Sequence, residues 1–199
     1  MVLQPRRPED FELLYEGTPP CEIGRPQPAL LALAEAGAIR GRVLDVGCGT
    51  GEHALLAATL GLEATGIDLA AAAIDRAREK AARRGLEARF VVGSVLDLTS
   101  LGGQFDTVLD SGLFHVLEDD DRSAFVAGLR AVVAPGGRYF LLCFSDRQPG
   151  VLGPRRITQD AIRAAFADGW RVDSIEPVLI DSAVQRAAAH AWLATITRT

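Results

Sequence analysis

The segment RVLDVGCGTGEH, residues 42–53, places an apolar run directly before three glycines at alternate positions, Gly47, Gly49 and Gly51. The apolar run is typical of a strand buried on both faces, and the alanine-rich run after the glycines is typical of a helix. Glycine accepts positive φ and carries no Cβ, so this loop allows a ligand to approach the main chain. Ligands of open parallel sheets bind beyond the carboxyl ends of the strands. The segment therefore predicts a ligand site at the end of the first strand.

Short β-rich runs alternate with helical runs through the rest of the chain. Seven strands are expected, at RVLDV, ATGID, ARFVV, FDTVLD, RYFLLCF, WRVDSIEPVLI and AHAWLATITR. The alternation predicts an α/β fold with a mostly parallel sheet and crossover helices. The turn residues Pro135, Gly136 and Gly137 are expected to stop the helix that follows the fourth strand.

The first 40 residues have a different character. Residues 10–28, DFELLYEGTPPCEIGRPQP, are dense in Pro and Gly, and the short helical run ALLALAEAG follows them. Phe11 and Tyr15 make the segment more apolar than a disordered tail needs to be. We expect residues 1–40 to form an ordered lid and helix over a core of residues 41–199, the two together making one compact domain.

Composition limits the partners. The 199 residues carry a net charge of −5, which argues against nucleic acid because phosphate binding needs clustered Lys and Arg. Cys21, Cys48 and Cys143 form no CxxC pair, so neither a disulfide framework nor a zinc site is indicated. No apolar run approaches the roughly 18 residues that a membrane span needs. We expect a cytoplasmic protein, a monomer or homodimer, that binds a small molecule and no membrane.

The glycine spacing argues against a phosphate ligand. A dinucleotide fingerprint reads GxGxxG, whereas here the glycines read GxGxG and Glu52 stands at the third glycine position. A P-loop needs a lysine that the segment lacks. Asp45, inside the strand, could orient the loop or face a cationic ligand, but it would repel a pyrophosphate.

Two further strand ends complete a nucleoside site. Asp68 ends the second strand about twenty residues after the loop, where a carboxylate accepts both ribose hydroxyls. Ser94 and Val95 follow the third strand, where a side-chain oxygen and a main-chain N–H could contact an adenine edge. A carboxylate for the ribose, polar groups for the adenine and no phosphate-binding loop together predict S-adenosyl-L-methionine as the ligand.

The sequence resembles the class I S-adenosylmethionine-dependent methyltransferases. The resemblance lies in VLDVGCGTG (43–51), GID (66–68), GSVLDL (93–98), FDTVLDSGLFH (105–115) and PGGRYFLL (135–142), which span nearly the whole chain. It implies a Rossmann-like methyltransferase fold and a methyl transfer that converts S-adenosyl-L-methionine to S-adenosyl-L-homocysteine.

The flanking segments resemble the thiopurine and halide/thiol methyltransferases and small methyltransferases of benzoquinones or heterocycles. They are YEGTPPCEIGRPQP (15–28), DSGLFHVLEDDDR (110–122) and LLCFSDRQPGVLGPRRITQDAI (141–162). The chain departs from that group's arm pattern, because Cys21 and Glu22 stand where Trp and Asp are expected. The resemblance implies an acceptor that is small and aromatic or a soft nucleophile, methylated on O, N or S.

Roles follow for individual residues. The expected cofactor-binding set is Tyr15, Gly17, Cys21, Asp45, Gly47, Gly49, Gly51, Asp68, Leu69, Ser94, Val95 and Ser111. The expected substrate-binding set is Phe11, Phe114, His115 and Arg155. His115 is the candidate catalytic base for a phenol or ring N–H, because its reference pKa lies near neutrality, and only a pocket wall for a thiolate or halide. The acidic run 118–121 is read as complementing a helix start, so no metal is expected.

Two other classes of function stay open. One is a NAD-dependent oxidoreductase, which the Glu52 spacing disfavours. The other is a non-catalytic protein that binds the cofactor without turning it over. The methyltransferase prediction itself includes a variant that transfers to thiols or halides and needs no general base, because in-line displacement at an activated methyl mainly requires alignment.

Overall fold

The structure is a computed structural model that describes residues 8–17, 19–150, 153–184 and 187–199. The strands are β1 (Val43–Val46), β2 (Ala64–Asp68), β3 (Arg89–Val92), β4 (Phe105–Ser111), β5 (Val133–Phe144), β6 (Trp170–Ile180) and β7 (Ala189–Arg198). The helices are α1 (Pro8–Leu14), α2 (Pro28–Glu35), α3 (Glu52–Thr59), α4 (Ala71–Arg84), the 3₁₀ helix η1 (Val95–Leu101), α5 (Asp119–Val132) and α6 (Gln159–Ala165).

The described strands form one seven-stranded sheet in the order β3-β2-β1-β4-β5-β7-β6. Strands β1 to β5 pair with one another in parallel, and β7 is antiparallel to both β5 and β6. The predicted seven-stranded, mostly parallel sheet is therefore confirmed. The strand order reverses between β1 and β4, which is the switch point where ligands of such sheets bind.

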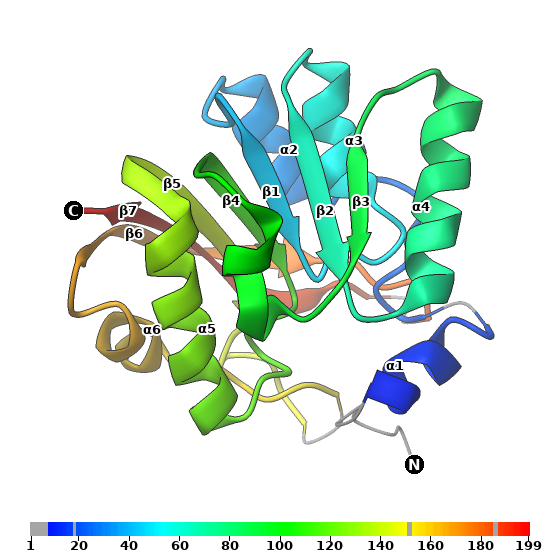
Figure 1. Ribbon diagram of the computed structural model, residues 1–199. Helices are drawn as coiled ribbons and strands as arrows, with labels where there is room; N and C mark the ends of the chain where they lie inside the picture. Colours follow the sequence, from blue (N-terminus) through cyan, green and yellow to red (C-terminus); the bar gives the residue numbers. More distant parts are fainter. Residues whose placement is uncertain (1–7, 18, 151–152, 185–186) are drawn as a thin grey trace.

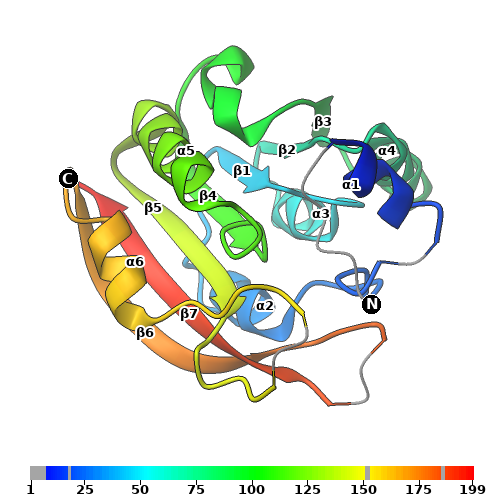
Figure 2. The ribbon, with the colours of Figure 1, turned by 90° about the horizontal axis from the view of Figure 1, so that it is seen from below.

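Helices cover both faces of the sheet (Figure 1). On one face α2, α3 and α4 pack against a core that includes Leu30, Leu55, Ile74 and Phe140. On the other face η1, α5 and α6 pack against a core that includes Leu98, Phe125, Phe166 and Tyr139. Figure 2 shows the sheet edge-on between these two layers. Burial on both faces explains why the central strands read as continuous apolar runs.

One expected boundary was wrong. The fifth strand was expected to start at Arg138, after Pro135 to Gly137 had stopped the helix, but α5 already ends at Val132 and β5 begins at Val133. The pairing of β4 with β5 shifts register between Phe105 and Thr107, so the turn residues are absorbed as an irregularity inside the strand.

The N-terminal segment lies against the start of α4 (Figure 1). The Glu12 carboxylate accepts hydrogen bonds from the main-chain N–H groups of Ala71 and Ala72, at 2.5 and 3.4 Å. Arg76, one turn further along α4, donates to the main-chain oxygens of Tyr15 and Gly17. These contacts attach residues 12–17 to the core, while the division at residue 40 stays a prediction.

Candidate active site

The carboxyl ends of four parallel strands meet at one edge of the sheet. Val46 of β1 lies opposite Ile67 of β2 and Asp110 of β4, and Asp68 lies opposite Val92 of β3. The loops that follow these strands therefore start side by side. They carry the predicted glycines, Asp68, Ser94 and Ser111.

The glycine loop has the predicted backbone. Gly47, Gly49 and Gly51 have φ values of 62°, 51° and 83°. A Cβ on Gly47 would lie 3.1 Å from Leu113 Cβ, one on Gly49 would lie 2.7 Å from the Tyr15 hydroxyl, and one on Gly51 would lie 2.7 Å from the Phe90 ring. A Cβ at each position would therefore press against one of the protein's own side chains, and at Gly51 it would meet Phe90 of β3 and Ala77 of α4.

Asp68 holds this loop in place. Its Oδ2 accepts from the N–H of Gly49 at 2.8 Å and its Oδ1 accepts from the N–H of Ala70 at 2.9 Å. Burial raises the pKa of Asp68, while the two hydrogen bonds favour its ionised form. Each carboxylate oxygen has a second lone pair, so both remain able to accept from a hydroxyl.

Asp45 lies beneath the loop. Its side chain is 1% exposed, and its Oδ2 accepts from the N–H of Ala54 in the first turn of α3 at 3.0 Å. Burial raises the pKa of Asp45 to about 8, and the nearby carboxylates of Asp110 and Asp68 add to this shift. Of the two roles considered from the sequence, the placement supports orientation of the loop and helix.

The described residues before α2, here called the arm, bring Tyr15 over the glycine loop at Gly49. Its side chain is buried against Ala70 and Ala73, and Cys21, further along the arm, is exposed. Gly17 is exposed, and its carbonyl accepts from Arg76. The side chain of Phe11 lies outside the described residues, so its predicted substrate contact stays a prediction.

The remaining cofactor candidates lie at the ends of β2, β3 and β4. Leu69 is partly exposed after β2. Ser94 is the N-cap of η1 and its Oγ accepts from the N–H of Leu96 at 3.2 Å. The side chain of Val95 belongs to the apolar core, which leaves its main chain for any ligand contact. Ser111 is half-buried at the end of β4.

A buried carboxylate shapes the turn after β4. Asp110 is fully buried and accepts from the Tyr139 hydroxyl at 2.6 Å and from the N–H groups of Leu113 and Phe114 at 2.8 and 3.2 Å. Burial raises the pKa of Asp110 to about 7 against the effect of these hydrogen bonds. This network sets the direction of the chain at residues 111–115.

His115 projects from this turn toward the end of β5. It is 6% exposed, and its Nδ1 accepts from the main-chain N–H of Phe144 at 3.0 Å. Burial, together with the charges of Arg156 and Arg122, lowers the pKa of His115 to about 3. The side chain is therefore neutral at physiological pH.

The other substrate candidates lie in different surroundings. Phe114 is fully buried in the core, with its ring 5.9 Å from that of Phe166 and the guanidinium of Arg122 4.6 Å from its centre. Arg155 pairs with Glu118 at 2.9 Å and Asp119 at 2.5 Å near the start of α5. The placement favours packing for Phe114 and a surface ion pair for Arg155.

Comparison with known proteins decides the family. Residues 43–137 match the family described as "Methyltransferase domain". The chain is 38% identical over 178 residues to the 2-heptyl-1-hydroxyquinolin-4(1H)-one methyltransferase of Mycobacteroides abscessus, covering 84% of this chain and 78% of the relative. The chain belongs to the class I S-adenosylmethionine-dependent methyltransferases.

Solved structures agree with this methyltransferase fold. One, described as "Conversion of a Disulfide Bond into a Thioacetal Group during Echinomycin Biosynthesis", is similar with a TM-score of 0.88 and 40% identity, covering 96% of this chain and 93% of that one. Magnesium protoporphyrin IX methyltransferase from Synechocystis PCC 6803 with bound S-adenosylmethionine shares the fold, with a TM-score of 0.66, 20% identity and coverage of 86% and 76%.

The methyltransferase site fits S-adenosylmethionine, the cofactor of this family. Asp68 keeps lone pairs for ribose hydroxyls, and the loop at Gly47 and Gly49 has the positive φ values that side chains avoid. The buried acid Asp45 lies on β1, next to the strand that ends in Asp68, and Asp110 lies on β4 on the other side of β1.

Sequence reasoning missed a polar cluster that connects the arm to the glycine loop. Lys80 of α4 donates to Thr50 and to Glu52, both at 2.6 Å, and lies 3.6 Å from Glu22 of the arm. Glu22 also accepts from the Thr50 hydroxyl, and Arg84 holds Glu52 through two hydrogen bonds of 2.9 and 3.0 Å. Glu52, which the sequence marked only as the wrong residue for a dinucleotide site, is thus a buried anchor of this cluster.

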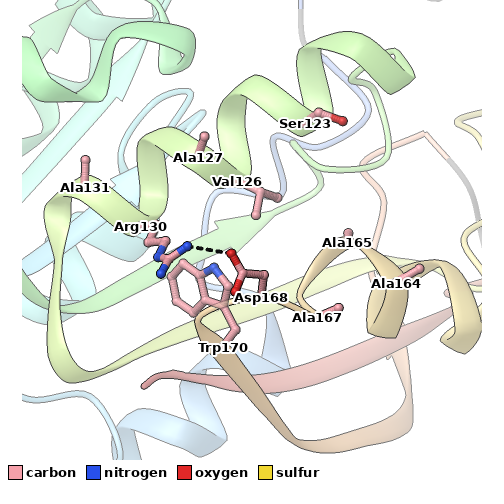
Figure 3. A pocket seen from close by; sticks show the side chains of 10 residues that line it. All are labelled: Ser123, Val126, Ala127, Arg130, Ala131, Ala164, Ala165, Ala167, Asp168 and Trp170. Carbon is pink, nitrogen blue, oxygen red and sulfur yellow. Dashed lines mark hydrogen bonds and ion pairs between the residues drawn. The ribbon is translucent and has the colours of Figure 1, made fainter.

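Two hollows lie away from the strand ends. One, of about 540 Å³, lies between α5 and α6, over Trp170 and beside the Arg130–Asp168 ion pair (Figure 3). The other, of about 420 Å³, lies between the arm at Glu22 and the connection from β6 to β7. Within the described ranges, no helix is long and apolar enough to span a bilayer, and no three His, Cys, Asp or Glu side chains gather as metal ligands.

Proposed function

We propose that this methyltransferase transfers the methyl group of S-adenosylmethionine to an oxygen of a small planar heterocycle. The observation that carries the proposal is the convergence of the glycine loop, Asp68 and the β4 turn with His115 at one sheet edge. Similarity over 84% of the chain to a methyltransferase of a hydroxyquinolone supports a heterocyclic acceptor.

The roles of the cofactor residues form part of this proposal. Gly47 and Gly49 would line the methionine end, Asp68 would accept from the ribose hydroxyls, and Ser94 and the main chain of Val95 would contact the adenine. When bound, the cofactor's sulfonium supplies a methyl carbon that is already activated for displacement. The chain then has to align the acceptor and exclude water.

Cofactor binding is tested by calorimetry with S-adenosylmethionine. Asp68→Asn keeps the side-chain shape but removes one acceptor oxygen and the charge, so we expect its affinity to fall about 10- to 100-fold, the worth of one or two hydrogen bonds to a charged group. Asp75→Asn, on the exposed side of α4 with its side chain 70% exposed, is the matched control and should bind like the wild type. Equal affinities for the two variants would refute the role of Asp68.

The acceptor is tested with a panel read by S-adenosylhomocysteine release and product mass. We expect 2-heptyl-1-hydroxyquinolin-4(1H)-one and related hydroxylated heterocycles to be methylated on oxygen. A sulfur acceptor is the second candidate, because the 40% identical structure comes from chemistry on a disulfide. If only thiols are methylated, the sulfur acceptor replaces the oxygen acceptor. If the protein binds S-adenosylmethionine but gives no product with any acceptor, the proposed catalytic function is wrong.

A further inference from the structure

The ring of His115 is held in one protonation state by the main chain. Phe144 donates its N–H to Nδ1 at 3.0 Å, so Nδ1 must carry a lone pair and not a proton. A neutral imidazole has one N–H, which therefore lies on Nε2. His115 offers the site a donor, and the lone pair that a base would need is already used inside the fold.

The Nε2 side of the ring lies next to Gly112, in the turn after β4. A Cβ on Gly112 would lie 3.3 Å from Nε2, which places this nitrogen against the backbone directly after β4. In the described part of the chain, Trp170 Nε1 is the single buried side-chain nitrogen or oxygen without a partner. No hydrogen bond among the described residues uses Nε2 of His115, so Nε2 must still reach solvent and remain available to a ligand.

The surroundings of His115 carry positive charge. From α5, Arg122 lies over the Phe114 ring and donates to the carbonyls of Phe114 and Leu117. From the loop before α6, Arg156 lies over the Phe144 ring, 5.5 Å from its centre. Cys143 of β5 is buried with its thiol protonated, since burial raises its pKa. The acids nearest in sequence, Glu118 and Asp119, have side chains that are 59% and 79% exposed; both pair with Arg155, and Asp119 also pairs with Arg122.

A hydrogen-bond donor with the charges of two arginines nearby suits an anion. We propose that His115 is a hydrogen-bond donor to the acceptor, and not its general base, so that the enzyme selects acceptors whose nucleophilic oxygen is already ionised. This rests on the proposed function and narrows its substrate class to acidic N-hydroxy heterocycles and electron-poor phenols. Phenols with a pKa near 10 are poor acceptors because they are almost wholly protonated at pH 7.

The step balances without a proton acceptor in the protein. The acceptor loses its proton to water before it binds. An oxygen lone pair then forms the bond to the methyl carbon while the bond from that carbon to sulfur breaks and its electron pair stays on sulfur. An anion and a sulfonium become two neutral products, and His115 keeps its Nε2 proton throughout.

The tautomer is tested directly by long-range ¹H–¹⁵N NMR of the imidazole rings, which is tractable because the chain has three histidines. The His115→Gln spectrum assigns the His115 signals. We expect a protonated Nε2 and an unprotonated Nδ1 from pH 5 to pH 8, with and without S-adenosylmethionine. A proton on Nδ1, or titration near the ordinary pKa of about 6.5, overturns the proposal whether or not any acceptor is turned over.

The donor role is tested by kinetics on acceptors of graded acidity. We expect kcat/KM to rise tenfold per pH unit up to each acceptor's own pKa and then to level, so that the inflection moves with the acceptor. A base acting on the neutral acceptor would give rates independent of pH below that pKa, and this result would overturn the proposal.

Two variants separate the roles. His115→Gln keeps an N–H donor but cannot take a proton, so we expect kcat/KM within about tenfold of the wild type and the same inflection. His115→Ala removes the donor, and we expect a loss of about 10- to 100-fold for all acceptors. If His115→Gln loses activity only on the least acidic acceptors, His115 acts as a general base and the proposal is wrong. Failure of cofactor binding would refute the proposed function while leaving the NMR result to decide the tautomer.

Discussion

Lys80 gives the sharpest test of how the arm is attached to the glycine loop. Its side chain is 12% exposed, and its ammonium contacts Glu52 and Thr50 at 2.6 Å and Glu22 of the arm at 3.6 Å. In Lys80→Met most of the apolar stem is kept, so the change removes charge and hydrogen bonds with little loss of packing.

The expected loss follows from these contacts. Breaking a buried ion pair costs about 3–5 kcal/mol, and the low end applies because Arg84 still holds Glu52 at 2.9 and 3.0 Å. We expect the free energy of unfolding to fall by about 3 kcal/mol, which for a chain of this size lowers Tm by roughly 6–12 °C.

The matched control is Arg83→Met on the same helix. Arg83 pairs with Glu79 at 3.8 Å, and the two side chains are 68% and 71% exposed, so the loss should stay below about 0.5 kcal/mol. Urea unfolding measures both variants, and hydrogen exchange of residues 12–24 shows whether the arm opens faster in Lys80→Met alone. If the two variants lose equal stability, or the arm exchanges alike in both, the cluster does not hold the arm.

Three further outcomes follow from individual contacts. Tyr139→Phe removes the hydroxyl that donates to Asp110 at 2.6 Å, so we expect the free energy of unfolding in urea to fall by about 2 kcal/mol. We also expect kcat to fall by more than the affinity for the cofactor. An unchanged free energy of unfolding and an unchanged kcat would contradict this role. Gly49→Ala should weaken cofactor binding in calorimetry, because its Cβ would lie 2.7 Å from the Tyr15 hydroxyl. Adding Tyr15→Phe to the Gly49→Ala chain should restore part of the lost affinity. No recovery in the double variant would mean that the arm does not hold Tyr15 over Gly49. Burial lowers the pKa of His53 from 6.5 to about 4, so the stability that its neutral ring contributes is present above pH 6.5 and is lost as the pH falls toward 4. The difference in free energy of unfolding between the wild type and His53→Gln should therefore shrink by about 2 kcal/mol between pH 6.5 and pH 5. A difference that stays constant over this range would refute the shift.

The sequence predicted the sheet well because its signal is local. Burial of the central strands on both faces makes them continuous apolar runs, and the alternation with helices leaves few topologies. The turn residues Pro135 to Gly137 misled the prediction for the same reason, since a Pro-Gly-Gly run has the composition of a loop even where it forms an irregularity inside a strand.

The sequence placed the candidate site residues at strand ends but could not give their bonding partners, and their roles stay predictions. Strand ends locate Gly49, Asp68 and His115 at one edge, and this needs only the parallel order. The partners that fix their states come from far along the chain: Tyr139 for Asp110, and the main-chain N–H of Phe144 for His115. Every residue except proline carries a main-chain N–H, so the residue types do not reveal which one donates to His115. The tautomer of His115 could therefore not be predicted from the sequence.

The charges around the site divide into two regions of opposite sign, and this division agrees with both proposals. Asp68 ends β2, where two main-chain N–H groups hydrogen-bond its carboxylate and the ionised form favours a cation such as a sulfonium. Arg122 and Arg156 act on His115 beyond the end of β4, where they favour an anion. Methyl transfer from the sulfonium to the anion removes both charges. A site with little water lowers the barrier of such a step, because the charged reactants lose more solvation there than the transition state does. The neutral products then lose the attraction that each region exerts on its own ligand, so the same charges that assemble the reactants favour release after the transfer.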